Sequence, residues 1–154
     1  MNYAGTLIVV RDPAQSARWY AELLELQTIA DYGANIALSG GLSLQSAESW
    51  KALIGAQTLS LPDNAAELYF EEEDLDVFLA RLEAHDVRQV HPPRTQRWGQ
   101  RVLRFYDPDG HIIEVGEPLR IVVARFYGDG MCAEQIAQRM EVPLDFVRAC
   151  LASA

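Results

Sequence analysis

Apolar and polar residues in the first third of the chain alternate in a way that predicts short strands around one helix. Leu7 to Val10 is an unbroken apolar block rich in β-branched residues, which is typical of a buried strand. Asp12-Pro13 then supplies an N-cap and a proline for the first helical position, and the helical pattern continues to about Leu26. Three strands should follow, over residues 27–32, 35–38 and 42–46. Gly40-Gly41 would form the turn between the last two.

The same order of elements returns in the middle of the chain. Leu68 to Phe70 predicts a strand, and Asp74 opens a helix with an apolar face at helical spacing. Strands over residues 87–90, 101–106 and 111–116 would complete the second set. Asp109-Gly110 would form the turn between the last two strands, as Gly40-Gly41 does in the first set. The pattern therefore predicts an internal duplication of a βαβββ unit.

Two such units predict an α+β fold within a domain spanning residues 1–118, with the units at residues 4–48 and 64–117. Each helix would cover one face of its own sheet and leave the other face bare. Pairing of the bare faces or edges would give a curved mixed sheet with a pocket in its concavity. Residues 46–64 are expected to be a linker with about one helical turn.

The pattern changes after Pro118. Helices are expected over residues 119–127, 133–140 and 143–152, and the last two resemble a helix-turn-helix pair. Residues 131–154 contain Glu134, Glu141 and Asp145 against Arg139 and Arg148, so this pair is not expected to read DNA. Residues 119–154 are instead expected to be a helical extension that packs on the domain or on a dimer partner.

The composition narrows the function further. With 49% hydrophobic and 23% charged residues the chain has the composition of one globular domain, and no apolar run is long enough for a membrane span. The start of the chain lacks a signal-peptide pattern, so a cytoplasmic location is expected. The net charge of -9 argues against nucleic acid and would favour a cationic ligand. Cys132 and Cys150 form no metal or disulfide pattern and are interpreted as buried small hydrophobes.

Several motifs together resemble the vicinal oxygen chelate superfamily, which includes glyoxalases, bleomycin-resistance proteins and extradiol dioxygenases. They are the strand at residues 7–12 followed by Ser16 and Trp19-Tyr20, then Trp98-Gly99, and the segment from Asp107-Pro108-Asp109-Gly110 to Glu114. The resemblance covers about residues 4–117. It implies a small-molecule ligand, a homodimer and one divalent metal, with no organic cofactor.

The resemblance also implies a ligand set. In metal-using members the ligands come from the first and last strands of each unit, and the register carries these places onto Gly5, Gln45, Glu67 and Glu114. Glycine has no side-chain ligand, so a histidine of the family type is missing. The remaining set is Gln45, Glu67 and Glu114, whose ligand atoms are all oxygens. Such a set would suit Mg or Mn better than Zn. Ni and Zn are kept as the less favoured metals.

Glu114 and Glu67 are the candidate catalytic carboxylates. Glu114 follows the family turn and is predicted to be a pocket residue, a metal ligand or general base, although strand alternation would also allow it to face outward. Glu67 is a pocket candidate by its position in the repeat. If no metal binds, two carboxylates in one cavity would repel, so the pair could instead hold a cation or transfer a proton.

A second cluster lies in the proline-stiffened loop at residues 91–101. We interpret it as a lid in which Trp98 is an apolar wall, Arg101 binds an anion and His91 acts as an acid or base. Alternatively, the arginines concentrated there, Arg94, Arg97, Arg101 and Arg104, only balance nearby acids such as those at residues 71–74. Three further residues are expected to line the pocket: Tyr69, Asn35 and Thr6.

Three functions stay open. The first is a glyoxalase-type lyase or isomerase, in which a metal polarises an enediolate oxygen and Glu114 or Glu67 moves the proton. The second is a bleomycin-resistance-type protein that sequesters a ligand without metal or catalysis. The third, a regulator that uses the C-terminal helices, is disfavoured by their charge. An extradiol dioxygenase needs a site of two histidines and one carboxylate, and no histidine falls in the ligand registers.

Overall fold

The structure, a computed structural model, describes residues 1–61 and 65–153 and has the predicted α+β architecture. Its described residues form two compact units. The first holds residues 1–61 with the turn Pro108–Gly110, and the second holds residues 65–107 and 111–153. The expected start of the second repeat, at Asn64, lies outside the described residues.

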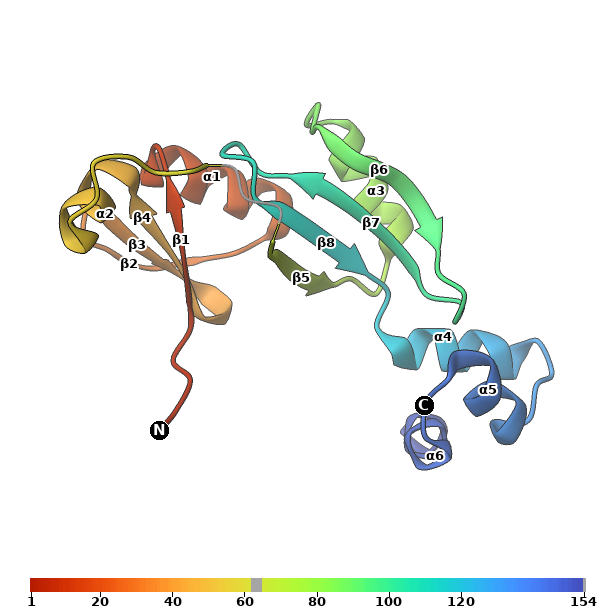
Figure 1. Ribbon diagram of the computed structural model, residues 1–154. Coiled ribbons are helices and arrows are strands. Elements are labelled where there is room, and N and C mark those ends of the chain that lie inside the picture. Colours follow the sequence, from red (N-terminus) through yellow and green to blue (C-terminus); the bar gives the residue numbers. More distant parts are fainter. Residues whose placement is uncertain (62–64, 154) are drawn as a thin grey trace. The chain divides into compact units, whose positions relative to one another are not determined.

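The first unit is a four-stranded mixed sheet with one helix on it. Its strands lie in the order β1 (Thr6–Val10), β4 (Leu42–Ser46), β3 (Asn35–Leu38) and β2 (Thr28–Asp31) (Figure 1). β1 is parallel to β4 and the other pairs are antiparallel. Helix α1 (Pro13–Leu24) begins at Asp12, whose carboxylate accepts a hydrogen bond from the Gln15 amide at 3.0 Å, and buries Tyr20 and Leu23 completely.

The connections of the first unit are more ordered than the sequence suggested. The short 3₁₀ turn η1 (Ser39–Gly41) joins β3 to β4 at the predicted glycine turn. Helix α2 (Ala47–Ile54) occupies the segment expected to be a linker with about one helical turn, and it is about twice that long. Local capping explains its length, because Ser46 accepts from the Ser49 amide at 3.2 Å and Gly55 ends the helix in the left-handed conformation.

The second unit repeats the topology of the first. Its strands lie in the order β5 (Glu67–Glu71), β8 (Ile112–Gly116), β7 (Arg101–Tyr106) and β6 (Gln89–Thr95), with helix α3 (Leu75–Glu83) after β5 (Figure 1). β5 is again parallel to β8, and the other neighbours are antiparallel. The identical order of strands confirms the predicted duplication of a βαβββ unit.

One face of the second sheet is apolar and lies against α3. Strand alternation places Leu103, Phe105, Ile113 and Val115 on that face, all fully or almost fully buried. The ring of Phe78 from α3 lies 6.1 Å from that of Phe105. Because successive side chains alternate between faces, the intervening residues of β7 and β8 project from the face that α3 does not cover.

Strand β6 corrects the sequence prediction. A loop was expected from residue 91, but the strand continues to Thr95, so His91 lies on a strand. Pro92 and Pro93 are tolerated there because β6 is an edge strand and its pairing with β7 shifts register between Gln89 and Arg94. The predicted lid is therefore shorter, and its loop begins after Thr95.

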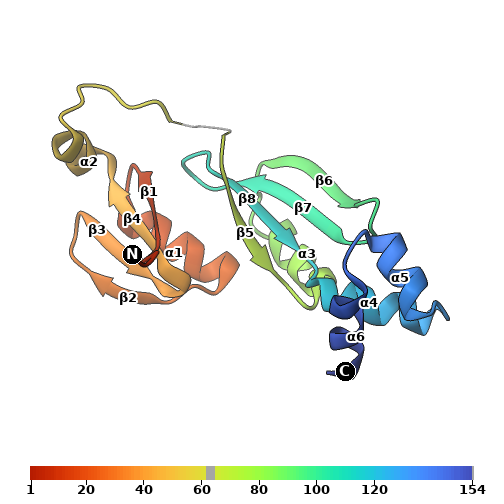
Figure 2. The same ribbon diagram turned by 60° about the horizontal axis from the view of Figure 1, so that its bottom comes forward.

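Three helices follow the second sheet, at the predicted places: α4 (Leu119–Gly128), α5 (Ala133–Met140) and α6 (Leu144–Ala152) (Figure 2). We call them the C-terminal extension. They share a small core of Val122, Val123, Ile136, Met140 and Val147 and belong to the second unit. Cys132 is exposed and Cys150 half-buried, so the prediction that both are buried small hydrophobes is wrong. In the described part of the chain no helix is long and apolar enough to cross a membrane.

Candidate functional site

Four polar side chains form a row across the uncovered face of the second sheet. In the strand register His91 of β6 lies opposite Arg104 of β7, Arg104 opposite Glu114 of β8, and Glu114 opposite Tyr69 of β5. Residues paired in this way share a face of the sheet. The row thus brings together three residues singled out in the sequence, around Arg104, for which the sequence suggested only the balancing of nearby acids.

A cavity of about 460 Å³ lies beside this row. It is lined by Glu67, Tyr69, Glu71, Trp98, Gln100, Glu114, Leu119, Met140 and Val142. The lining combines carboxylates from β5 and β8 with apolar side chains from the β6–β7 loop and the C-terminal extension. Such a mixture is typical of small-molecule sites, in which apolar walls surround a few polar groups.

Arg104 is bound to both candidate carboxylates. Its Nε donates to Glu67 Oε2 at 2.8 Å, and its guanidinium forms an ion pair with Glu114 Oε2. Glu114 is 8% exposed, and its Oε2 accepts no hydrogen bond from the described residues, so the ion pair is the contact that compensates its charge. The mutual repulsion expected of two carboxylates in one cavity is relieved by the cation between them.

His91 is tied to the same arginine. Arg104 lies 3.4 Å from His91 Nε2, and because a guanidinium can only donate, Nε2 must accept. The other ring nitrogen, Nδ1, then carries the proton and donates to the Pro92 carbonyl at 2.8 Å. These contacts join His91 to Arg104, and its predicted role as acid or base stays a prediction.

A chain of hydrogen bonds fixes the other side of the cavity. Trp98 Nε1 donates to Gln100 Oε1 at 2.9 Å, and Gln100 Nε2 donates to the Tyr69 hydroxyl at 3.1 Å. Burial raises the pKa of Tyr69 despite the bond from Gln100, and its hydroxyl donates to Glu71 at 3.3 Å. Gly116 makes room for this chain, since a Cβ there would lie 3.1 Å from Gln100 Nε2 and 3.3 Å from the Tyr69 ring.

Next to this chain of hydrogen bonds, Glu117 is a buried acid bound by two arginines. Arg125 donates to both carboxylate oxygens, at 2.8 and 3.0 Å, and the Arg101 amide donates at 2.9 Å. Burial favours the neutral acid, but these hydrogen bonds and the arginine charges outweigh it and hold the pKa of Glu117 below its usual value. The Glu117 carbonyl also accepts from Gln100 at 2.7 Å, which ties this acid to the cavity wall.

The depressed pKa of Glu117 predicts a pH-dependent contribution to stability. A lowered folded-state pKa stabilises the protein above the unfolded value of 4.5, and this stability is lost as the pH falls through the folded-state pKa. Glu117→Gln should therefore lower the free energy of unfolding by about 2 kcal/mol at pH 7 and by much less near pH 3. Urea unfolding at the two pH values measures the loss of stability, and an equal loss at pH 7 and pH 3 would contradict the prediction.

Arg101, the predicted anion-binding residue, does not line the cavity. Its guanidinium is paired with Asp76 of α3, with one hydrogen bond of 3.1 Å, and contacts Glu117 at 3.8 Å. Asp76 raises the pKa of Arg101, and Arg101 lowers that of Asp76. The contacts of Arg101 therefore match the alternative interpretation, in which the loop arginines balance the charge of nearby acids.

The remaining candidates lie in the first unit. Gln45 is buried with its amide fully engaged, because Oε1 accepts from Asn35 at 3.0 Å and Nε2 donates to Ser49 at 2.9 Å. Thr6 is exposed and shares a hydrogen bond with Tyr3. Gly5, in the register of the missing histidine, packs against backbone: a Cβ on it would lie 2.3 Å from the Gly41 carbonyl oxygen.

The donor set does not fit a divalent metal. Glu67 and Glu114 share a guanidinium, and a metal between them would have to displace that cation. The Gln45 amide oxygen already accepts a hydrogen bond. Within residues 1–61 and 65–153 no group of three or more His, Cys, Asp or Glu side chains is arranged to hold a metal ion.

Sequence reasoning missed several lining residues, namely Glu71, Gln100, Leu119, Met140 and Val142. Glu71 could have been found, since alternation along β5 puts it on the face of Glu67 and Tyr69. Nothing in the local pattern marks the three extension residues, because their place depends on how distant helices pack.

Comparisons with known proteins agree with the fold and the motifs. The model of the glyoxalase-like domain matches residues 3–120. A protein of unknown function from Agrobacterium tumefaciens str. C58 is 35% identical, with a TM-score of 0.70 over 77% of this chain and 94% of that one. A glyoxalase-related enzyme from Fulvimarina pelagi is 21% identical, with a TM-score of 0.67 over 77% and 88%.

A glyoxalase/bleomycin resistance protein/dioxygenase family enzyme from Burkholderia phytofirmans PsJN is 16% identical, with a TM-score of 0.66 over 74% of this chain and 96% of that one. No curated protein matches the chain significantly. The family match stops at residue 120, so most of the C-terminal extension lies beyond it. The chain belongs to the glyoxalase-like domain family, which confirms the resemblance to the vicinal oxygen chelate superfamily.

Proposed function

We propose that the protein is a non-catalytic binder of a small organic cation with an aromatic or other flat apolar part. The ligand would lie in the cavity of the second unit. The observation that carries this proposal is the pairing of Arg104 with Glu67 and Glu114. In this pairing the partner of the two carboxylates is the guanidinium group, an organic cation, and not a metal ion. The bleomycin-resistance-type alternative is thus favoured over the lyase. A homodimer and a cytoplasmic location stay predictions.

Charge supports a cationic ligand. Three carboxylates line the cavity, those of Glu67, Glu71 and Glu114, and Arg104 beside them supplies one positive charge, which leaves two negative charges in excess. The whole chain is acidic as well, with a net charge of -9. An approaching cation is therefore attracted both by the protein as a whole and by the cavity.

The apolar side of the cavity supports a flat group on that cation. Trp98 presents an aromatic ring whose indole nitrogen is fixed by Gln100, and Leu119, Met140 and Val142 supply aliphatic surface. An aromatic face also attracts a cation by about 0.5–2 kcal/mol. Charge and apolar contact would thus act on different ends of one ligand.

Two probes with the same ring test the proposal. Naphthylmethyl-trimethylammonium carries a permanent positive charge and naphthylacetate a negative one. We expect the cation to bind with a Kd of about 1 mM or lower and at least about tenfold more tightly than the anion, a difference of about 1.4 kcal/mol, because the cavity carries an excess of negative charge. Isothermal titration and Trp fluorescence measure both.

Glu114→Gln should reduce this preference for the cation about tenfold, because it removes a cavity charge without changing the side-chain shape. Glu48→Gln, at an exposed glutamate of the first unit paired only on the surface with Lys51, is the matched control and should change neither affinity. Trp98→Ala should weaken both probes. Equal binding of the two probes, or no binding of the cation up to about 10 mM, would refute the proposal.

Metal titration separates this proposal from the lyase alternative. Because Arg104 occupies the two carboxylates, we expect no saturable binding of Mn, Ni or Zn up to about 1 mM at pH 7. Calorimetry, joined to the metal content of protein purified without chelator, measures this. Tight stoichiometric binding that disappears in Glu114→Gln would support metal-assisted catalysis and overturn the proposed function.

A further inference from the structure

We propose that the C-terminal extension is the specificity-determining wall of the cavity and selects the size of the ligand's apolar part. This inference rests on the proposed function and deepens it. Leu119, Met140 and Val142 line the cavity, and the last two lie beyond residue 120, where the match to the family domain ends. The sheet would then supply charge, and sequence outside the family domain would supply apolar selectivity.

An apolar core joins the extension to Trp98. The buried cluster of the extension includes Val122, Ile136 and Met140, and both Trp98 and Leu119 pack against it. Met140 therefore belongs to the core on one side and to the cavity lining on the other. Because packed cores resist changes in volume, the position of the cavity wall is fixed by the folding of the extension.

Polar contacts join the extension to the β6–β7 loop in three places. Arg125 of α4 donates to the Gly99 carbonyl at 2.6 Å as well as to Glu117. Arg97 of the loop pairs with Glu141 at 2.6 Å, and Arg139 of α5 donates to the Arg97 carbonyl. Exposed pairs contribute little individually, but together they fix the loop that carries Trp98 against α4 and α5.

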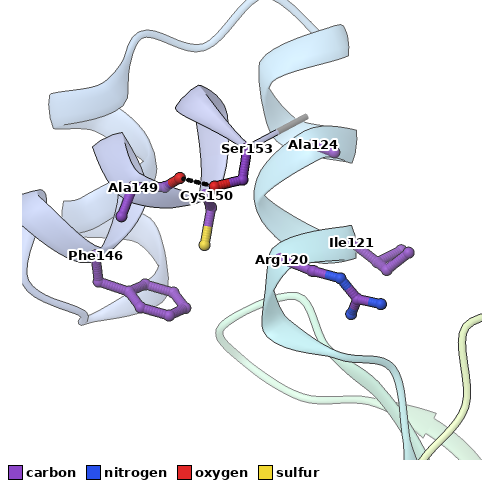
Figure 3. Close-up of a pocket in the computed structure, with 7 residues that line it drawn as sticks. All are labelled: Arg120, Ile121, Ala124, Phe146, Ala149, Cys150 and Ser153. Atoms are coloured by element: carbon purple, nitrogen blue, oxygen red, sulfur yellow. Dashed lines mark hydrogen bonds between the residues drawn. The ribbon is translucent and has the colours of Figure 1, made fainter.

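The two sides of the extension provide a matched control. One side lines the cavity, and another groove, of about 420 Å³, lies between α4 and α6 and is lined in part by Ile121, Ala124 and Phe146 (Figure 3). Phe146 is 36% exposed and belongs neither to the cavity lining nor to the core cluster. A substitution there changes apolar surface of the extension without touching the cavity.

Trimethylammonium probes that carry a benzyl, naphthylmethyl or anthracenylmethyl group measure the size selectivity directly. Val142→Phe narrows the cavity and should weaken the three-ring probe about tenfold relative to the one-ring probe. Leu119→Ala widens it and should shift the ratio the other way. Phe146→Ala should leave the ratio unchanged. Glu114→Gln should weaken all three probes by a similar factor, because the charge they share is lost.

The outcomes separate this inference from the proposed function. If the probes bind and respond to Glu114→Gln, but Val142→Phe and Leu119→Ala keep the wild-type size ratio, the extension is not the wall and the proposed function stands. If no cation binds, the proposed function fails, and the size selectivity that rests on it fails with it. Acrylamide quenching of Trp98, obtained by subtracting the Trp98→Phe signal, tests the wall itself without a ligand. Quenching should rise in Leu119→Ala/Val142→Ala but not in Phe146→Ala, and no rise means that the extension does not cover Trp98.

Discussion

Replacing Arg104 with methionine is expected to lower the free energy of unfolding by about 3 kcal/mol. The guanidinium contacts Glu67 and Glu114. Glu114 is 8% exposed, and its Oε2 accepts no hydrogen bond from residues 1–61 and 65–153. Removing one partner of a buried ion pair leaves an uncompensated charge and costs about 3–5 kcal/mol. The lower end applies here because Glu67 is 38% exposed and screened by solvent.

Urea unfolding at pH 7 measures the loss, and two further variants identify its cause. Arg104→Met/Glu114→Gln should regain more than half of it, because the stranded charge is gone. Arg120→Met breaks an exposed pair with Glu73 and should cost less than about 1 kcal/mol. If Arg104→Met unfolds within about 0.5 kcal/mol of the wild type, Arg104 is not the partner that keeps the two carboxylates together.

The same variant should bind the cationic probe more tightly than the wild type. With Arg104 gone, the trimethylammonium group can take the place of the guanidinium beside Glu114, so a change that destabilises the empty protein strengthens ligand binding. A metalloenzyme predicts a different result, in which the wild-type protein already binds Mn or Ni. The cation titration of Arg104→Met and the metal titration of the wild type therefore distinguish the proposed function from its alternative.

The fold was predictable because its signals are local. The Asp12-Pro13 start of α1, the apolar blocks of β1 and β8 and the glycine turns each act within a few residues, and their repetition revealed the duplicated unit. The error at β6 has a non-local cause. Its prolines suggested a loop because the local sequence does not show that β6 is an edge strand, where a missing amide is tolerated.

The site was predictable only in part because it depends on contacts between distant segments. Glu114, Glu67 and Tyr69 were chosen from the repeat and the family turn, and Trp98 from the proline-stiffened loop; all four line one cavity. The role of Arg104 follows from the pairing of β7 with β8, a register that no single strand specifies. Met140 reaches the cavity through the packing of three helices, which leaves no short-range pattern in the sequence.

Gly99→Ala is expected to be the second strongly destabilising change, with a loss of about 3 kcal/mol. Gly99 has a φ of +91°, which is strained for alanine, and a Cβ there would lie 2.3 Å from Cζ and 2.7 Å from Cε2 of Phe126. The strain and the overlap each cost about 1–3 kcal/mol. The Phe126 ring is held within the extension, so it cannot move aside freely.

Comparison with Gly130→Ala separates the two causes of the loss, the backbone strain and the overlap with Phe126. Gly130 has nearly the same φ, +90°, but no atom of the described residues lies within 4 Å of the added Cβ, so alanine there should cost only the strain, about 1 kcal/mol. Urea unfolding of both variants gives the cost of the overlap as their difference. If Gly99→Ala loses no more stability than Gly130→Ala, the β6–β7 loop does not press against α4. The loop that carries Trp98 would then lack its closest contact with the extension.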